Sequence, residues 1–224
     1  MECSRVSEEF LRKPRIAVDM VKNTYPDKIL RRLSVSGGKD QWESDSFLIF
    51  TDIVGYSDWC KDKSANEVYQ MLYRLFKSIE STCHETVNRL ETVGDAWIGV
   101  CSDPNPAIET CIRIIRQVPI YKKLLFPEFN IRIGLHHGTV LNVVDSRWQI
   151  YGNPMNVASR LESSCKPGCI HIMADVYHRF FSNNTQVSEI ESFINQIKFD
   201  DYLLKGLGFR RTAMLKPFQR VSFP

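Results

Sequence analysis

The chain has 224 residues, of which 43% are hydrophobic, so it is long enough for one well-buried domain with a short extension. Its formal net charge is only +3 and no long run of like charges occurs, so composition gives no case for a nucleic-acid or membrane-surface partner. No apolar segment approaches the ~20 residues of a membrane span. The N-terminus, with Glu8, Glu9 and Lys13, lacks the apolar core of a signal peptide. We therefore expect a cytoplasmic protein.

Two regions are predicted along the chain. Residues 1–45 form an N-terminal extension, and residues 46–224 form the main domain. Within the extension, Asp27 to Leu33 follow Tyr25-Pro26 and precede Gly37-Gly38, which predicts a short helix. Packing of this helix on its own domain is one interpretation of its role.

The first strand of the main domain ends in a carboxylate. Phe47 to Phe50 are four consecutive apolar residues, as in a strand buried on both faces, and Asp52 follows at the strand's end. Gly55 would let backbone N–H groups approach an anionic ligand, and a polar segment begins at Tyr56. Taken alone, Asp52 is better explained as a loop cap than as a ligand.

A second carboxylate lies at a predicted hairpin tip. Arg89 to Val100 comprise two short β-prone segments joined by Gly94-Asp95, a two-residue hairpin signal. If this hairpin pairs beside the first strand, Asp52 and Asp95 face each other. Two close carboxylates are tolerable chiefly when a divalent cation neutralises them, so the pair predicts a site of the Mg²⁺ type.

The remaining elements complete a β-α-β-β-α-β order. Ser64 and Glu67 form a capping-box pattern before a helix, and Pro106 opens a second helix that Pro119 is expected to end. Asn153-Pro154 is expected to start a third helix, with Asn153 as its cap. The other predicted elements are strands at 129–135, 139–144, 148–151 and 169–173, a helix at 174–181, a loop at 183–192 and a closing hairpin of 198–204 with 210–215.

Four sequence motifs, in this order, resemble those of class III nucleotide cyclase catalytic domains. They are Phe50-Thr51-Asp52-Ile53-Val54-Gly55-Tyr56, Glu91-Thr92-Val93-Gly94-Asp95-Ala96, Arg132-Ile133-Gly134-Leu135-His136-His137-Gly138 and Tyr151-Gly152-Asn153-Pro154-Met155-Asn156-Val157-Ala158-Ser159-Arg160-Leu161-Glu162. The resemblance covers roughly Ser46 to Leu215. It implies an α+β fold with a ferredoxin-like βαββαβ core and a closing C-terminal hairpin, and it gives the helix in the extension a second possible role, in dimerisation.

The resemblance also implies a reaction and the residues that carry it. Such enzymes convert a nucleoside triphosphate to a 3′,5′-cyclic nucleotide and pyrophosphate with two Mg²⁺ or Mn²⁺ ions per site. By resemblance, Asp52, Asp95 and the Ile53 carbonyl hold the ions. Asn156 and Arg160, four residues apart on one helix face, would orient the ribose and stabilise the transition state.

Two basic residues match residues that contact the phosphates in the family. Arg132 matches one of them, and Lys205 matches a lysine of the final hairpin. The second match is weaker because Leu207 replaces a common lysine, so a plain surface lysine is the alternative at Lys205. His136 and His137 have no partner at metal-ligand spacing and are interpreted as structural.

Three positions bear on the base. Glu91 lies where guanylate-making relatives have Glu and adenylate-making ones have Lys, and a carboxylate suits the donors of guanine. Gln149 stands where relatives usually have Cys or Asp, and Tyr56 replaces a usual Phe. Larger, more polar residues favour a smaller base, so we hypothesise a pyrimidine, with UTP first and cyclic UMP as the product. Chains of this type resemble bacterial pyrimidine cyclases of anti-phage signalling.

Assembly and rival functions follow from the same resemblance. In the family, the metal carboxylates come from one subunit and the base, ribose and transition-state residues from the other, and this chain carries both sets. A head-to-tail homodimer with sites at the interface is therefore expected. The alternatives are a guanylate cyclase making cyclic GMP and a catalytically silent dimerisation domain. A nucleic-acid-binding domain is disfavoured because Phe50 and Trp97 lie in apolar strand contexts.

Overall fold

The computed structural model describes residues 40–144, 147–182 and 194–218. The predicted helix at 27–33 and the predicted loop at 183–192 lie outside them. The described residues form two compact units, one of residues 40–43 with 141–144 and 147–150, and one of 44–140 with 151–182 and 194–218. We call these the small unit and the main unit. The predicted boundary between residues 45 and 46 stays a prediction.

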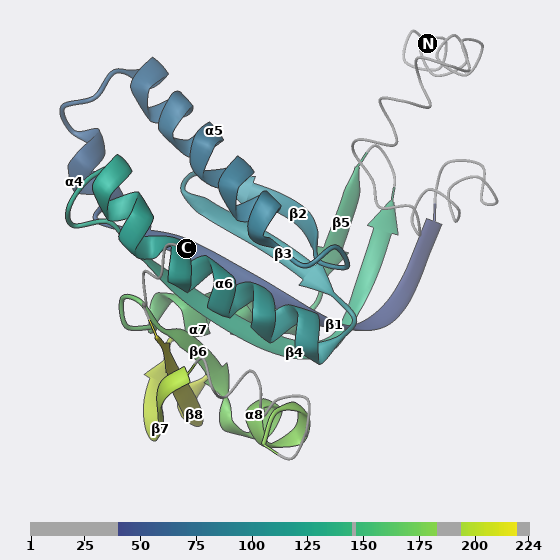
Figure 1. Ribbon diagram of the computed structural model, residues 1–224. Coiled ribbons are helices and arrows are strands. Elements are labelled where there is room, and N and C mark those ends of the chain that lie inside the picture. Colours follow the sequence, from purple (N-terminus) through teal and green to yellow (C-terminus); the bar gives the residue numbers. More distant parts are fainter. Residues whose placement is uncertain (1–39, 145–146, 183–193, 219–224) are drawn as a thin grey trace, which may run out of the picture. The chain divides into compact units, whose positions relative to one another are not determined.

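Five helices and eight strands make up the described part of the chain (Figure 1). In chain order they are β1 (Asp40–Val54), α4 (Tyr56–Cys60), α5 (Ala65–Thr82), β2 (Asn88–Val93), β3 (Ala96–Cys101), α6 (Pro104–Leu124), β4 (Asn130–Val144), β5 (Trp148–Tyr151), α7 (Asn153–Ser163), β6 (Ile170–Met173), α8 (Ala174–Phe180), β7 (Ile194–Leu204) and β8 (Gly208–Pro217). The strands form one mixed sheet in the order β2-β3-β1-β4-β6-β8-β7, with β5 paired to β4. The predicted α+β fold with a closing hairpin is confirmed.

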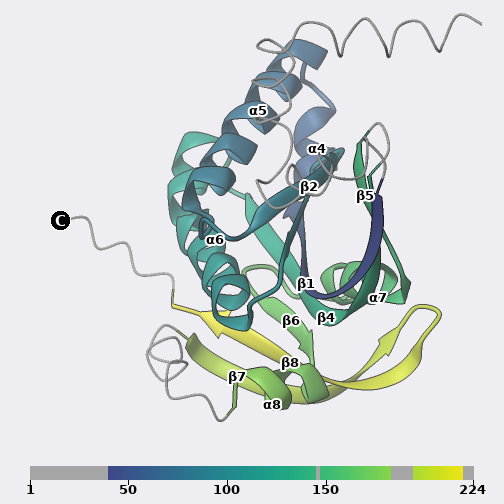
Figure 2. The ribbon, with the colours of Figure 1, turned by 90° about the vertical axis from the view of Figure 1, so that its right-hand side faces the viewer.

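The two faces of the sheet in the main unit carry different helices. Figures 1 and 2 show α5 and α6 over one face and α7 on the other. Alternate residues of β4, namely Ile131, Ile133 and Leu135, join the core that α5 and α6 help to form. Because successive strand residues point to opposite faces, Arg132 and Gly134 face α7.

The helix α5 forms as the sequence predicts. The Ser64 side chain accepts a hydrogen bond from the Glu67 N–H, and the Glu67 side chain accepts one from the Ser64 N–H, which completes a capping box. Met71, Leu75 and Ile79 recur at helical spacing and are all buried. This helix therefore packs on the sheet through one apolar stripe.

Three local predictions are wrong. Pro119 does not end its helix but lies inside α6, because the buried stripe runs from Val118 before the proline to Tyr121 after it. The strands predicted at 129–135 and 139–144 are one strand, β4, since Gly138 marks a close approach rather than a break: an added Cβ there would lie 2.6 Å from Cγ of Pro154. The N-cap of α7 is Gly152, with φ 145°, and not Asn153.

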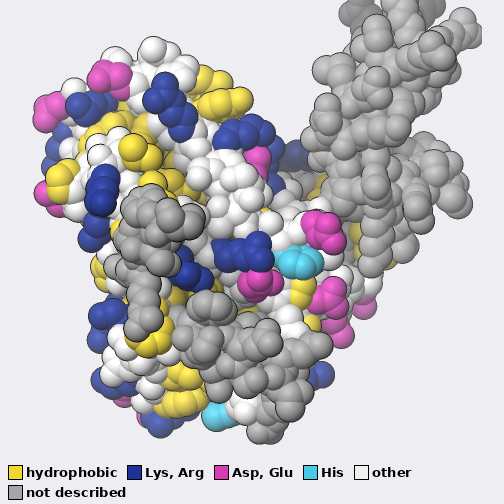
Figure 3. Space-filling model, viewed as in Figure 1, with side chains coloured by type: hydrophobic (Ala, Val, Ile, Leu, Met, Phe, Trp, Pro, Cys, Tyr) yellow, Lys and Arg dark blue, Asp and Glu magenta, His cyan; other side chains and the backbone are white. Residues whose placement is uncertain are grey.

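The surface charges are mixed, as the near-balanced net charge of +3 leads us to expect. Figure 3 shows acidic, basic and hydrophobic side chains interspersed on the face viewed there. Within the described residues, no helix combines the length and the apolar character needed to cross a membrane.

Candidate active site

Two predicted site residues of the first two motifs, Asp52 and Glu91, share one face of the sheet. In the β1–β3 and β2–β3 ladders, Phe50 pairs with Ile98, and Ile98 pairs with Glu91. Side chains directly opposite each other in paired strands lie on the same face. Asp52, two residues beyond Phe50, lies on that face too. We call this the site face; it is opposite α5 and α6, and Arg132 of the neighbouring strand β4 also points to it.

Asp52 and Asp95 come together as predicted. Thr51 of β1 pairs with Trp97 of β3, and Val93 pairs with Ala96 across the Gly94-Asp95 turn, so the hairpin tip lies beside the end of β1. Burial raises the pKa of Asp95, and the charge of Asp52 beside it raises that pKa further. The backbone N–H of Ile53 donates to the Asp95 carboxylate, which opposes the shift. The chain thus holds two carboxylates in contact at a partly buried position.

The turn after Asp52 brings Tyr56 to the same place. Gly55 has φ 84°, a left-handed conformation that suits glycine, and it is the N-cap of the short helix α4. Tyr56 begins α4. Burial raises the pKa of Tyr56 to about 12, with contributions from Cys60 and from the charge of Asp95. A phenol that senses the Asp95 charge lies close to the carboxylate pair.

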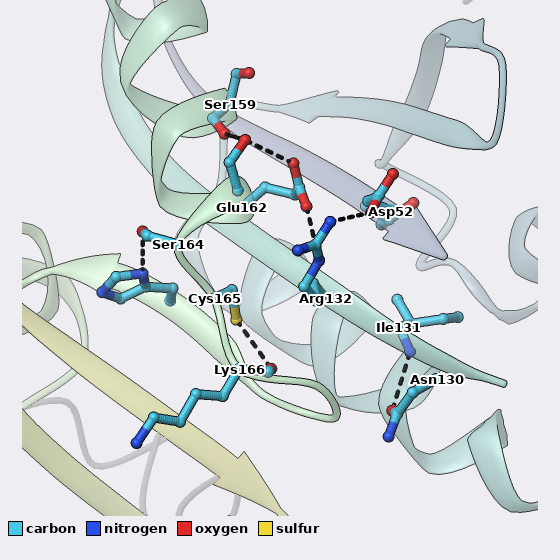
Figure 4. A network of polar contacts seen from close by, with 12 residues as sticks. Asp52, Asn130, Ile131, Arg132, Ser159, Glu162, Ser164, Cys165 and Lys166 are labelled. Carbon is cyan, nitrogen blue, oxygen red and sulfur yellow. Dashed lines mark hydrogen bonds and ion pairs between the residues drawn. The ribbon is translucent and has the colours of Figure 1, made fainter. Parts of the chain in front are cut away.

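Arg132 joins the carboxylate pair to helix α7 (Figure 4). Its Nη2 donates to Oδ2 of Asp52. On its other side, Nε lies 3.2 Å from Oε1 of Glu162, which is an ion pair without the angles of a hydrogen bond. Both carboxylates and the guanidinium are less than one-third exposed, so water screens these charges only partly.

Glu162 is a residue of this network that sequence reasoning missed. It is only 9% exposed, and burial raises its pKa to about 7 despite the nearby Arg132 charge. The helical spacing of the sequence could have indicated it. The buried residues of α7 are Val157, Ala158, Leu161 and Glu162, so a carboxylate occupies the apolar stripe of the helix. A charged residue in such a stripe needs a charged partner.

Asn156 and Arg160 lie on a different side of α7. Asn156 is exposed and Arg160 is partly buried. Glu162 is two residues beyond Arg160, which is about 200° around the helix. Since Glu162 faces β4 and Arg132, the predicted ribose and transition-state residues point away from the Asp52 carboxylate of the same chain.

The structure does not bring every predicted residue to the carboxylate pair. Gln149 belongs to the small unit, and its role stays a prediction. Lys205 follows the last residue of β7 at the tip of the β7–β8 hairpin and is exposed. Burial lowers the pKa of His136 to about 4, and His137 packs against Phe47 with ring centroids 4.5 Å apart. The ring contact agrees with a structural role for His137.

The donor set at the carboxylate pair fits a hard divalent cation. Adjacent carboxylates are oxygen ligands that Mg²⁺ takes, and Mg²⁺ commonly completes its shell with water and substrate phosphates. Among the described residues, no cluster of three or more His, Cys, Asp or Glu side chains could hold a metal by itself. A substrate-completed site is therefore the arrangement that these residues allow.

Comparison with known proteins gives a consistent family. A family model for the adenylate and guanylate cyclase catalytic domain matches residues 41–206. Among curated proteins, guanylate cyclase beta of Plasmodium falciparum (isolate 3D7) is 25% identical over 214 residues, which cover 87% of this chain. The match spans 7% of that protein's length, so the likeness concerns one part of it.

Two solved structures have similar folds. The guanylate cyclase domain of RhGC from Catenaria anguillulae in complex with GTP has a TM-score of 0.65 and 26% identity, over 80% of this chain and 98% of that chain. A non-canonical dimeric guanylyl cyclase domain of the RhoGC fusion protein from the aquatic fungus Blastocladiella emersonii has a TM-score of 0.63 and 26% identity, with the same coverage of 80% and 98%.

Proposed function

Because the chain belongs to the family of adenylate and guanylate cyclase catalytic domains, we propose that it converts a nucleoside triphosphate to a 3′,5′-cyclic nucleotide and pyrophosphate. One observation carries the proposal: Asp52 and Asp95, from separate motifs, meet at a strand end and a hairpin tip beside Arg132. This is the constellation that cyclisation needs, with acceptors for cations and a fixed positive charge for phosphates.

Asp52, Asp95 and the Ile53 carbonyl would hold two Mg²⁺ or Mn²⁺ ions. When bound, such ions activate the 3′ hydroxyl and neutralise charge on the leaving pyrophosphate. The chain supplies the cradle: the Ile53 N–H and the Gly94-Asp95 turn fix the Asp95 carboxylate against Asp52. The contact between like charges is costly until cations bind, which favours binding of a metal-bound triphosphate.

Arg132 and Lys205 would bind the phosphates. A guanidinium presents several donors in a fixed plane, which suits phosphate oxygens better than a flexible ammonium does. Lys205 on its exposed hairpin tip would reach them from outside the sheet. The weaker match at Lys205 makes Arg132 the principal phosphate ligand of the proposal.

A second copy of the chain would complete each site. Asn156 would orient the ribose and Arg160 would stabilise the charge that develops in the transition state. Because these side chains point away from Asp52 within one chain, they would serve the carboxylate pair of a partner subunit. A homodimer with two equivalent sites is the assembly that follows. The RhoGC domain, which forms a non-canonical dimer, supports the self-association of such domains.

For the base we propose GTP first, in place of the UTP that the sequence alone favoured. The RhGC and RhoGC domains are both guanylate cyclases, and the RhGC domain contains GTP. Glu91, which the second copy of the chain would contribute, has a carboxylate that can accept hydrogen bonds from the N1–H and 2-amino groups of guanine. UTP is the second candidate. The observation for it is Tyr56 beside Asp95, because a phenol there narrows the space available to substrate.

The activity is tested by incubating the purified chain with each of the four nucleoside triphosphates and Mg²⁺ or Mn²⁺, then identifying products by mass spectrometry. We expect cyclic GMP. The Asp52→Ala variant should lose activity by at least about a hundredfold, because it removes a metal carboxylate. Cyclic UMP as the only product would instead support the second candidate. A folded wild-type chain that makes no cyclic nucleotide from any of the four would contradict the proposal and favour the silent dimerisation domain.

A further inference from the structure

Burial of the Glu162 carboxylate on the apolar stripe of α7 costs free energy. Glu162 is the only charged residue on the buried stripe of that helix, whose other members are Val157, Ala158 and Leu161. Its carboxylate contacts the Arg132 guanidinium and the hydroxyl of Ser163, which lies 3.2 Å from Oε2. A carboxylate this buried loses its hydration, so an uncharged residue would suit packing better unless the charge serves Arg132.

The backbone fixes Glu162 against the strand that carries Arg132. A Cβ added at Gly134 would lie 2.2 Å from the Ala158 carbonyl oxygen and 2.4 Å from the Glu162 nitrogen, so α7 touches β4 there. Gly134 and Arg132 are two residues apart in β4 and point to the same face. The start of the Glu162 side chain is thereby held beside Arg132 by main-chain contact rather than by flexible side chains.

The two carboxylates hold opposite parts of one planar group. Glu162 faces the Nε side of the guanidinium and Asp52 receives Nη2 (Figure 4). With both in place, the plane of the guanidinium is defined from two directions, one from α7 and one from β1. With Glu162 uncharged, the contact with Asp52 is the one that remains, and the guanidinium can rotate about it.

We propose that Glu162 is a positioning residue, which anchors the Nε side of the Arg132 guanidinium at α7 so that the group stays in one orientation beside the carboxylate pair and is presented to the triphosphate. The inference rests on the proposed role of Arg132 at the phosphates. Glu162 itself touches neither substrate nor metal in this proposal. Its effect on triphosphate binding is exerted through Arg132 alone. The proposal can therefore be tested by comparing variants of Glu162 with and without Arg132.

The expected kinetic effect is a split between KM and kcat. Phosphate binding by Arg132 is an interaction of both the bound substrate and the transition state, so weakening it raises KM more than it lowers kcat. For Glu162→Gln we expect KM for the preferred triphosphate to rise about tenfold, with kcat within about twofold of wild type. Glu162→Asp keeps the charge and should recover part of the loss.

The experiment is a double-mutant cycle. Wild type, E162Q, R132Q and the double variant are compared for KM, kcat and affinity for a 3′-deoxy triphosphate analogue, which cannot cyclise. E109Q is the matched control, because it neutralises one partner of the Glu109–Arg113 ion pair on the surface of α6. Thermal unfolding and circular dichroism check that each variant is folded.

We expect E162Q to weaken analogue binding about tenfold in the wild-type background and to have no further effect when R132Q is present. Equal effects in both backgrounds, or an E162Q affinity equal to that of E109Q, would overturn the inference. If E162Q does not fold, partial loss in E162D that disappears in the R132Q background supports it, and unchanged affinity in E162D overturns it. Because the analogue reports binding, a wild-type chain that binds it without turnover would refute the proposed activity and leave this test intact.

Discussion

His171 in β6 has none of its side chain exposed, and both ring nitrogens have partners. One nitrogen, Nε2, lies 2.7 Å from Oγ1 of Thr212, and Nδ1 lies 3.0 Å from both the Leu161 carbonyl oxygen and the Ser164 hydroxyl. Burial lowers the pKa of His171 to about 4, and the hydrogen bond to Leu161 opposes this only in part. The histidine is therefore neutral in the folded chain at physiological pH.

This buried histidine predicts acid sensitivity. Its pKa is lower in the folded chain than in the unfolded chain, so the stability it contributes is full above pH ~6.5 and is lost progressively as pH falls from there towards 4. We expect the free energy of unfolding to drop by about 2 kcal/mol between pH 7 and pH 4.5 from this group alone. Urea denaturation of wild type and His171→Gln at both pH values measures it.

The His171→Gln variant should show a smaller drop, since glutamine keeps polar partners but does not titrate. His84→Gln serves as the control, because His84 lies in the turn between α5 and β2 and is partly exposed. Equal pH dependence of wild type and His171→Gln would show that burial of His171 does not limit acid stability.

The contact between α7 and β4 governs the site at the scale of whole elements. Gly134 lets the helix backbone reach the strand, as the 2.2 Å approach of an added Cβ to the Ala158 carbonyl oxygen shows. Gly134→Ala must push α7 away from the sheet. We expect a loss of stability of about 3 kcal/mol, together with a raised KM because Glu162 moves away from Arg132.

Gly206→Ala is the comparison for that variant. Gly206 has φ +79° and nothing within 4 Å of an added Cβ, so its cost is backbone strain of about 1 kcal/mol without a clash. Thermal unfolding of both variants separates crowding from strain. If Gly134→Ala were no less stable than Gly206→Ala, α7 would not be held by close packing at Gly134.

The sequence predicts elements well where a local rule and the packing agree. The capping box at Ser64 and the Gly94-Asp95 turn are such cases, and the structure has both. It fails where packing overrides the rule. Pro119 costs α6 a hydrogen bond, about 3 kcal/mol with its steric clash, but the burial of Val118 and Tyr121 offsets it. Gly138 looks like the end of a strand when the local sequence is considered alone. The reason for a glycine there is its close approach to Pro154, which lies 16 residues further along the chain, so a local rule cannot detect it.

At the scale of the whole molecule, the site was only partly predictable. Asp52 and Asp95 could be placed together because a strand end and a hairpin tip are local features. Glu162 could not, since its role depends on which strand α7 covers. The sequence predicts that Asn156 and Arg160 share a helix face; that this face points away from Asp52 requires the orientation of α7 on the sheet.

That orientation supports the central proposal, that one chain carries two half-sites and that each active site is built from two chains. In this proposal Asp52 belongs to one half and Arg160 to the other. Asp52→Ala and Arg160→Ala should therefore each be inactive as a homodimer. A mixed dimer of the two variants contains one site with both defects and one site with neither.

The most direct measurement is the activity of the two inactive variants after mixing. Equal amounts, unfolded and refolded together to exchange subunits, should recover about a quarter of wild-type activity, because half of the dimers are mixed and each has one intact site. Each variant treated in the same way alone should stay inactive. A mixture as inactive as its components, with mixed dimers verified by differential tags, would contradict an active site shared between two subunits.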